Sequence, residues 1–354
     1  MATETIADLG AQPATDRRLS LDEVTALARR ILLSNGVSAA QAEPIVRTVT
    51  AAERDECRSH GLYRLLTYIR SIRLGQAKGN AEPTLHDDGG ALVRVEGYRG
   101  FAPLAFDRGR ALLVEKARRN GIAALVIRDC HHNSALWAEV EPLAAEDGIA
   151  AIAFNPTHSW VAPAGGSRPL FGTNPIAFSW PRPNGEPFVF DFATSAVARG
   201  EMELHRRGGR PIPSGWAVDA AGQTTTDAAA GLAGAMLPFG GYKGTGIQIM
   251  IELLAGAMIG DAMSYQSSDA DAGHGGVPLH GELIIAFDPA RFRAGREGDP
   301  LADAEGLFER FGAQPGARLP SERRYAARRR TVVEGVLVPR PLHDELVALA
   351  DAGE

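Results

Sequence analysis

The residues best suited to chemistry lie together in the segment Arg58–Arg64, which reads Arg-Ser-His-Gly-Leu-Tyr-Arg. It brings a hydroxyl (Ser59), an imidazole (His60) and two guanidinium groups into seven residues. An imidazole exchanges a proton near neutral pH, and a guanidinium binds a carboxylate through two parallel hydrogen bonds. The combination favours a site for an anionic substrate that takes part in proton transfer. The alternative is a helix junction with a surface histidine and salt-bridged arginines.

Two helical patterns flank this segment, at residues 43–56 and 62–74, and Gly61 lies near their junction. A glycine is a common place for a helix to end or restart. If the second helix begins near His60, then His60 and Arg64 are four residues apart and share one helix face. The acid–base group and the anion-binding group would then point the same way.

Composition excludes several other functions. The chain has 354 residues, 45% of them hydrophobic and 23% charged, which is ordinary for a globular protein of two or three subdomains. The net charge of −6 does not favour a nucleic-acid surface. Two cysteines, Cys57 and Cys130, give neither a disulfide framework nor a zinc spacing and fit a reducing cytoplasm. The longest apolar run, residues 247–259, contains Glu252 and predicts a buried helix, so no membrane partner is expected.

Helix and strand patterns alternate without a regular β-α-β-α order, which predicts a mixed sheet in an α/β fold. Ser20 and Glu23 form a capping-box pattern that opens a helix over 21–34. Further helices are expected at 103–120, up to 146, up to 259 and from 342, and strands at 91–95, 122–127, 149–154, 176–180, 188–191, 281–287 and 331–338. Residues 97–100 are expected to form a turn and residues 264–278 a mobile loop.

A nucleotide site of the usual kinds is not indicated, because the sequence has neither a G-x-G-x-x-G turn nor a P-loop. The glycine-rich segment 240–244 is a candidate instead, since backbone N–H groups at a helix start attract phosphate and Lys243 adds charge. Its alternative is a glycine-rich turn with a surface lysine.

The adjacent His131 and His132 follow a strand pattern. Neighbouring residues do not share a face of a helix or strand, so a two-histidine metal clip is not expected, and no H-E-x-x-H spacing occurs. We therefore expect no metal site. One histidine could instead bind a ligand at the strand end, or cap the next helix.

Acidic and basic residues elsewhere could complete the site. Asp191, at the end of an apolar strand, could fix the tautomer of His60, or could cap a helix. Glu201 could play the same part, or form a surface salt bridge. The arginine cluster at 323–330 could reach a 2′-phosphate, or be a solvated basic face.

In this order the motifs resemble the malate/L-lactate dehydrogenases that are unrelated to Rossmann-type enzymes. The matching motifs are Ser59-His60-Gly61 with Arg64, His132, 172–175, 191–195, 215–216, 225–227 and 237–244. One branch is more similar still, the Δ1-piperideine-2-carboxylate/Δ1-pyrroline-2-carboxylate reductases, through 131–137, 161–166, 198–201 and 323–328.

The resemblance implies an NADPH-dependent reduction, with NADH as the other candidate cofactor, of a cyclic imine acid to L-pipecolate or L-proline in a homodimer. It also implies a non-Rossmann nucleotide domain on a mainly antiparallel sheet, beside a helical domain for substrate and dimerisation. We expect a mobile tail at 1–18, the helical domain at 19–120 with 330–354, and the NAD(P)H-binding domain at 121–329.

The resemblance also implies residue roles. Ser59 and His60 match the relay and proton donor, with Asp191 or Glu201 as the acid that completes it, and Arg64 matches the residue that holds the substrate carboxylate. Thr173, Arg199 and Gly200 would line the substrate side. The nucleotide contacts would be His132, Asn133, Ser134, Ala135, Leu136, Asp191, Phe192, Ala193, Lys243, Gly244, Arg323 and Arg324. Asn133 departs from the family, which usually has Phe there, and the loop 155–160 departs from the branch.

Two alternatives remain open. A 2-keto/2-hydroxy acid dehydrogenase of the malate or lactate type would use the same His60 and Arg64 on C=O instead of C=N. Glu201 separates the two, because the keto-acid branches tend to carry Lys there. A ligand-binding relative without turnover is the other alternative, and the retained Ser59, His60 and Arg64 argue against it.

Overall fold

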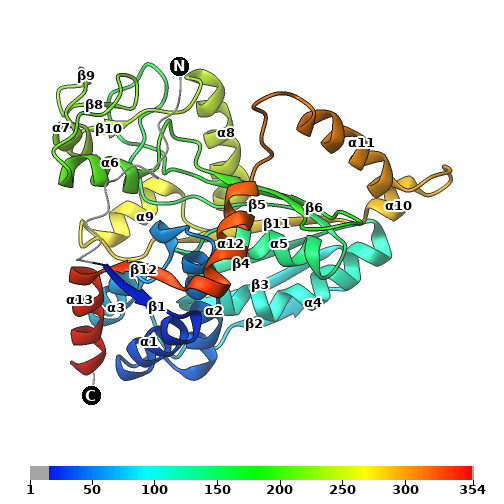
Figure 1. Ribbon diagram of the computed structural model, residues 1–354, viewed down its shortest axis with the longest axis horizontal. Coiled ribbons are helices and arrows are strands. Elements are labelled where there is room, and N and C mark those ends of the chain that lie inside the picture. Colours follow the sequence, from blue (N-terminus) through cyan, green and yellow to red (C-terminus); the bar gives the residue numbers. More distant parts are fainter. Residues whose placement is uncertain (1–15, 353–354) are drawn as a thin grey trace.

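The structure is a computed structural model that describes residues 16–352. Its centre is a seven-stranded sheet in the order β2-β3-β4-β11-β5-β6-β7 (Figure 1). The strands are β2 (Thr84–Asp87), β3 (Leu92–Phe101), β4 (Ile122–His131), β5 (Ala150–Phe154), β6 (Ile176–Trp180), β7 (Phe188–Phe192) and β11 (Leu279–Phe287). Among these pairs β3 and β4 run parallel and the other five are antiparallel. The expected mixed, mainly antiparallel sheet is confirmed.

Helices cover both faces of the sheet (Figure 1). On one face, α4 (Ala102–Asn120) and α5 (Trp137–Ala145) share a core with Leu125 of β4. On the other, α8 (Tyr242–Glu252) and the π-helical turn Leu253–Ala257 share a core with Val126. Successive residues of a strand point to opposite faces, so β4 needs apolar side chains at both positions. This explains its continuous apolar sequence.

A helical part packs beside the sheet, at the lower left of Figure 1, and joins the two ends of the described chain. It contains α1 (Leu21–Ser34), α2 (Ala39–Arg54), α3 (Arg64–Arg73), α13 (Arg340–Asp351) and the antiparallel pair β1 (Asp16–Leu19) and β12 (Val336–Pro339). The predicted capping box opens α1, since the Glu23 N–H donates to Ser20 Oγ and the Ser20 N–H donates to the Glu23 carboxylate. Leu346 of α13 packs in one core with Ile31 and Ile45.

The remaining elements form smaller units. The strands β8 (Ala217–Val218), β9 (Thr224–Thr225) and β10 (Ala235–Met236) pack with α6 (Arg199–Arg207) and α7 (Ala228–Ala233). The start of α6 reaches the segment 58–64, because a Cβ added at Gly200 would lie 4.0 Å from Ser59 Cβ. The helices α9 (Ser264–Asp271), α10 (Pro289–Arg293), α11 (Pro300–Gly312) and α12 (Glu322–Glu334) complete the fold.

The turn expected at 97–100 is wrong. Strand β3 runs on to Phe101, and its register with β4 shifts between Glu96 and Gly100. Tyr98 and Arg99 absorb this bulge with φ angles of 52° and 65°. The two glycines therefore mark an irregular strand instead of its end.

The mobile loop expected at 264–278 is also wrong over its first half, which forms α9. The backbone N–H of Ser264 donates to the buried Glu252 carboxylate at 2.8 Å. The strand expected at 331–338 begins later, because α12 continues to Glu334 before β12 starts.

The expected tail at 1–18 falls mostly on residues 1–15, which lie outside the described residues, while 16–18 belong to β1. Residues 84–101 contribute two strands to the same sheet as 121–329, so a boundary at 120 passes through one sheet. The assignment of the two parts to substrate and cofactor stays a prediction. Within residues 16–352, no helix is long and apolar enough to cross a membrane.

Candidate active site

The segment 58–64 is a short connector between α2 and α3, so the second helix begins at Arg64 and not near His60. Arg58–His60 form a 3-10 turn after α2, and Arg64 begins α3. The Ser59 hydroxyl lies 3.0 Å from Nδ1 of His60. This contact leaves the other ring nitrogen, Nε2, without a hydrogen bond to residues 16–352.

Gly61 is required by a close approach of the chain. A Cβ at this position would overlap the carboxylate of Glu53, and Oε1 of that carboxylate accepts a hydrogen bond from the Leu62 N–H at 2.8 Å. Burial raises the pKa of Glu53 to about 7, although the Leu62 N–H opposes this shift. The connector that carries His60 is thus held to α2 by the hydrogen bond between the Leu62 N–H and Glu53.

His60 is neutral in its present surroundings. Burial of the ring lowers the pKa of His60 to about 3, and the nearby Arg64 and His132 add to the shift. The charge of Arg64 thus acts on His60, although the two residues do not share a helix. A ligand carboxylate next to the ring would raise this pKa, because an opposite charge favours the protonated form.

Within residues 16–352 the charge of Arg64 has no carboxylate partner, and its contact with an aromatic ring is a distant one, 6.0 Å to the Tyr63 centroid. Its Nε atom is buried without a hydrogen bond, and no carboxylate of residues 16–352 pairs with its guanidinium. Burial lowers the pKa of Arg64. A buried charge without a counterion costs free energy, so the site is prepared to gain from an incoming anion.

Arg199 is a second guanidinium, next to Gly200, whose position lies close to Ser59. It stacks on the Trp160 ring, with 5.0 Å from its guanidinium carbon to the ring centroid, and burial lowers its pKa. Thr173 precedes β6 and is held by its backbone, which donates to Thr157 Oγ1 at 3.0 Å and accepts from the Thr194 N–H at 2.8 Å.

The two acids considered for the relay have other partners. Oδ2 of Asp191 accepts a hydrogen bond from the Trp137 N–H at 3.0 Å, so it caps the start of α5. Burial raises the pKa of Asp191 to about 6. Glu201 lies 3.7 Å from Nε2 of His205 on the same helix. Neither carboxylate hydrogen-bonds to His60 among the contacts of the described chain.

The strand-end segment expected to hold the nucleotide is built around His132, which is buried. Its backbone N–H donates to the Pro278 carbonyl at 3.0 Å, and Nε2 lies 3.0 Å from Glu139 Oε1. Asn133 and Ser134 are half-buried, whereas Ala135 and Leu136 are buried. Across the sheet, Phe192 is 45% exposed and Ala193 is half-buried.

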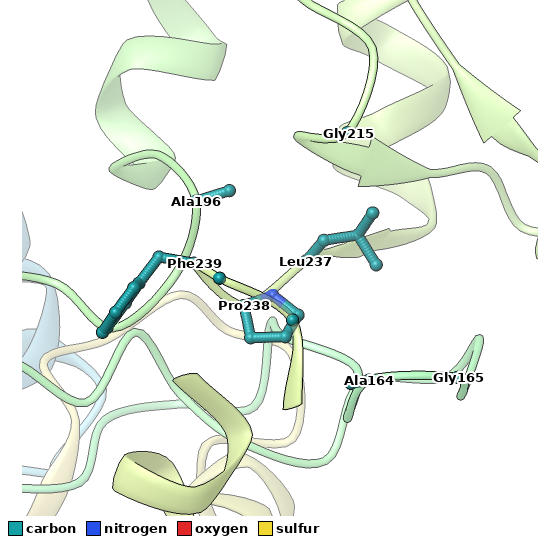
Figure 2. A pocket seen from close by; sticks show the side chains of 9 residues that line it. Ala164, Gly165, Ala196, Gly215, Leu237, Pro238 and Phe239 are labelled. Carbon is teal, nitrogen blue, oxygen red and sulfur yellow. The ribbon is translucent and has the colours of Figure 1, made fainter. Parts of the chain in front are cut away.

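The glycine-rich loop leads into α8 beside a cavity of about 380 Å³. Figure 2 shows Leu237, Pro238 and Phe239 between Ala196 and the Ala164–Gly165 turn, with apolar side chains on the wall. Gly240 and Gly241 have φ angles of 57° and 61°, which favour glycine. Gly244 is buried where a Cβ would overlap the Phe239 carbonyl, and Lys243 is exposed.

Comparison with known proteins shows the family of this chain. The sequence profile described as malate/L-lactate dehydrogenase matches residues 19–347. The chain belongs to this family. The Δ1-pyrroline-2-carboxylate reductase 2 of Burkholderia multivorans is 54% identical over 341 residues, which are 96% of this chain and 100% of that protein.

Two further members of the family carry related names. The Δ1-pyrroline-2-carboxylate/Δ1-piperideine-2-carboxylate reductase of Pseudomonas aeruginosa is 54% identical, covering 94% of this chain and 99% of that protein. The crystal structure of Δ1-piperideine-2-carboxylate reductase from Pseudomonas syringae pv. tomato superposes with a TM-score of 0.89 at 38% identity, covering 94% of this chain and 99% of that chain. The resemblance noted from the sequence is confirmed for the family and the fold.

The structure assigns different parts to the two arginines expected to contact the nucleotide. Arg324 is buried, pairs with Asp55 at 2.7 Å and with Glu141, and lies over the Trp137 ring at 4.1 Å. Its hydrogen-bonding atoms are thus committed to this protein network. Arg323 is exposed on the same helix, so a phosphate contact there stays a prediction.

Sequence reasoning missed a set of buried polar groups around the ends of β4, β5 and β11. These groups belong to Glu139, Asn155, His158, His280 and Glu282. The signal for Glu282 was a charged residue inside an apolar strand pattern. Nothing local distinguished the others.

Proposed function

We propose that this protein reduces cyclic imine carboxylates, Δ1-pyrroline-2-carboxylate to L-proline and Δ1-piperideine-2-carboxylate to L-pipecolate. The observation that carries the proposal is the unpaired, buried Arg64 beside a neutral His60, in a chain 54% identical to reductases named for these substrates. Arg64 supplies the anion site that a ring carboxylate needs.

In the proposed reaction the ring carbon of C=N gains a hydride and the ring nitrogen gains a proton. Arg64 holds the carboxylate, so that one face of the ring is presented to the donor; this is catalysis by positioning. The reduced nicotinamide, when bound, supplies the hydride.

His60 is the proposed proton donor. In the protonated ring both nitrogens carry hydrogen, so Nδ1–H donates to the Ser59 hydroxyl 3.0 Å away, and Nε2–H is left to give its proton to the imine nitrogen. Burial is the main cause of the low pKa of His60, and the charge of Arg64 adds to it; a carboxylate bound at Arg64 compensates that second contribution. The proton-binding capacity of His60 therefore rises when the substrate is in place.

We propose Asp191, in preference to Glu201, as the acid that completes the relay, and we propose that it acts on His60 indirectly. Asp191 and His132 lie close enough for each charge to shift the other's pKa, and His132 in turn influences His60. Asp191 would act on His60 through His132.

The residues fit a dinucleotide. Phosphate would meet the N-terminus of α8 at Gly240 and Gly241, with Lys243 nearby, since helix N-termini bind anions. The exposed Arg323 favours NADPH over NADH. The nicotinamide end would meet the strand-end segment 132–136 and residues 191–193. A homodimer in the cytoplasm is proposed with this assignment.

A 2-keto acid dehydrogenase is the second candidate, because the family name covers malate and L-lactate enzymes. It would use Arg64 and His60 in the same way on C=O. Glu201, which pairs loosely with His205, favours the imine substrate, given the lysine that keto-acid branches tend to carry. A ligand-binding relative without turnover does not explain why the proton donor is retained.

The test is NADPH oxidation measured in parallel with Δ1-pyrroline-2-carboxylate, Δ1-piperideine-2-carboxylate, pyruvate and oxaloacetate. Rapid oxidation with the cyclic imines and little with the keto acids is expected. The reverse pattern would move the protein to the keto-acid branch. NADPH binding without turnover of any of the four would favour the ligand-binding alternative.

A further inference from the structure

Three proton-binding side chains meet at the end of β4, and no lysine or arginine of residues 16–352 pairs with them. His132 follows the last pair of β4, Glu139 lies in the first turn of α5 and Glu282 lies in β11. Nε2 of His132 is 3.0 Å from Glu139 Oε1 and 3.9 Å from Glu282 Oε2. We call these three residues the buried cluster; their exposed fractions are 4%, 3% and 1%.

The cluster must hold protons at neutral pH. No lysine or arginine of residues 16–352 pairs with either carboxyl group, and Glu139 and Glu282 hydrogen-bond to each other, which requires a proton on one of them. Two adjacent buried carboxyls cannot both ionise. Burial raises the pKa of Glu139 to about 8, and burial with the charge of Glu139 raises the pKa of Glu282 further. Burial lowers the pKa of His132.

The groups around the cluster do not change this balance. Asp191 of β7 and Asp107 of α4 add negative charge that raises the pKa of Glu139, and the Tyr68 hydroxyl of α3 lies within the field of Glu139. The ring of His280 lies 5.8 Å from that of His132, and its pKa is lowered by burial. None of these groups supplies a cation.

The proton on Glu139 decides which nitrogen of His132 carries hydrogen. When Glu139 is protonated, its O–H donates to Nε2, so the ring hydrogen lies on Nδ1. When Glu139 loses its proton, Nε2–H donates to the carboxylate and Nδ1 keeps a free lone pair. One proton leaves the cluster in total, and Nδ1 changes from donor to acceptor. Nδ1 has no hydrogen bond to residues 16–352.

We propose that Glu139 and Glu282 are positioning residues that keep Nδ1 of His132 a hydrogen-bond donor toward an oxygen of the bound cofactor or substrate. The proposal deepens the proposed function and rests on it for the identity of the ligands. Glu282 keeps its proton, because burial and the charge of Glu139 raise its pKa, and its hydrogen bond to Glu139 lowers the pKa of Glu139, which is therefore the carboxyl that titrates. The acceptor is the nicotinamide carboxamide oxygen or the substrate carboxylate, and the two are separated below.

The experiment compares wild type with Glu139→Gln, Glu282→Gln and the control Glu141→Gln between pH 6 and 10. Glu141 is also a buried carboxyl of α5, but its charge is balanced by Arg324 and Arg328. If the acceptor is the nicotinamide carboxamide, the NADPH dissociation constant, measured by fluorescence, will depend on the protonation of Glu139. If the acceptor is the substrate carboxylate, KM for the imine, determined separately from kcat, will depend on it instead. Thermal unfolding monitors the fold of each variant.

As the pH rises through the alkaline range, we expect wild type to lose about 5–10-fold in its affinity for either NADPH or the imine, which is the equivalent of one hydrogen bond. This alkaline loss of affinity, the alkaline limb of the pH profile, should vanish in Glu139→Gln, because the amide does not titrate. It should remain in Glu141→Gln and in Glu282→Gln, because the amide of the second variant resembles the protonated carboxyl that it replaces. An identical limb in Glu139→Gln and wild type would overturn the proposal.

A second measurement serves if Glu139→Gln does not fold. In ¹⁵N-histidine-labelled wild-type protein, His132 should change tautomer in the alkaline range, with its signals assigned by their loss in His132→Gln. A constant tautomer from pH 6 to 10 would refute the proposal. So would one equivalent of a bound divalent metal in the purified protein, since a metal ion would replace the shared proton. An affinity limb for NADPH without imine turnover would refute the proposed function and leave this proposal standing.

Discussion

Replacing Arg64 by methionine distinguishes a role of this residue in substrate binding from a role in the stability of the fold. Arg64 makes no ion pair within residues 16–352, so its removal deletes no protein contact of its charge. Methionine keeps an unbranched chain of similar length and removes a buried charge that has no counterion. We expect the free energy of unfolding without substrate to stay the same or to rise.

Activity should respond in the opposite direction. Two charge-assisted hydrogen bonds to the substrate carboxylate are lost, which is worth about 3–4 kcal/mol or about 10²–10³-fold in kcat/KM. Arg64→Lys should recover part of this loss, because lysine keeps the charge without the planar fork. Steady-state kinetics with a cyclic imine, beside chemical denaturation, measures both quantities.

Arg324→Met is the matched control. This arginine is buried like Arg64, but it is paired with Asp55 and Glu141. Leaving those carboxylates without a partner should destabilise the fold by about 3–5 kcal/mol. If Arg64→Met destabilises the protein as much as Arg324→Met does, or leaves kcat/KM unchanged, then Arg64 is a structural residue and does not form the anion site.

Other perturbations address the same segment. His60→Asn should lower kcat by about 10²–10⁴-fold with little effect on NADPH binding, measured by fluorescence; near-normal turnover would remove His60 from the proton-donor role. Gly61→Ala should destabilise the fold by about 1–3 kcal/mol in denaturation, because the added methyl group overlaps Glu53, whereas unchanged stability would mean that the connector yields freely. Burial raises the pKa of Glu53 from 4.5 to about 7, so its stabilising contribution is complete below pH 4.5 and is lost as the pH rises to about 7. Glu53→Gln should flatten this part of the stability profile, and an unchanged slope would show that Glu53 does not titrate there.

Local signals predicted the parts of the fold that depend on neighbours in sequence. The capping box placed α1 at its observed bounds, and the apolar alternation placed β6 at 176–180. The segment 58–64 could be identified as a site for the same reason, since its groups are adjacent in the chain.

Contacts between distant segments could not be predicted from the sequence. Gly97 looked like a turn residue, but it is needed because a side chain would overlap Cys130 of the neighbouring strand. Helix α9 has no apolar stripe and is held through Ser264 by a carboxylate of α8. The buried cluster joins β4, α5 and β11, so Glu139 and Glu282 carry no shared pattern in the sequence.

The pairing of β1 with β12 has a consequence for synthesis of the chain. The core around α1, α2 and α3 is closed by Val336, Val338 and Leu346, which follow α3 by about 270 residues. At about 5–20 residues per second, the ribosome needs about 13–54 s to supply them. During this interval the connector that carries His60 lacks the support of α13, and the sheet itself is complete only once its central strand β11 has been made, at Phe287. We therefore expect the helical part that carries His60 to close only after the central sheet, once α13 has been made.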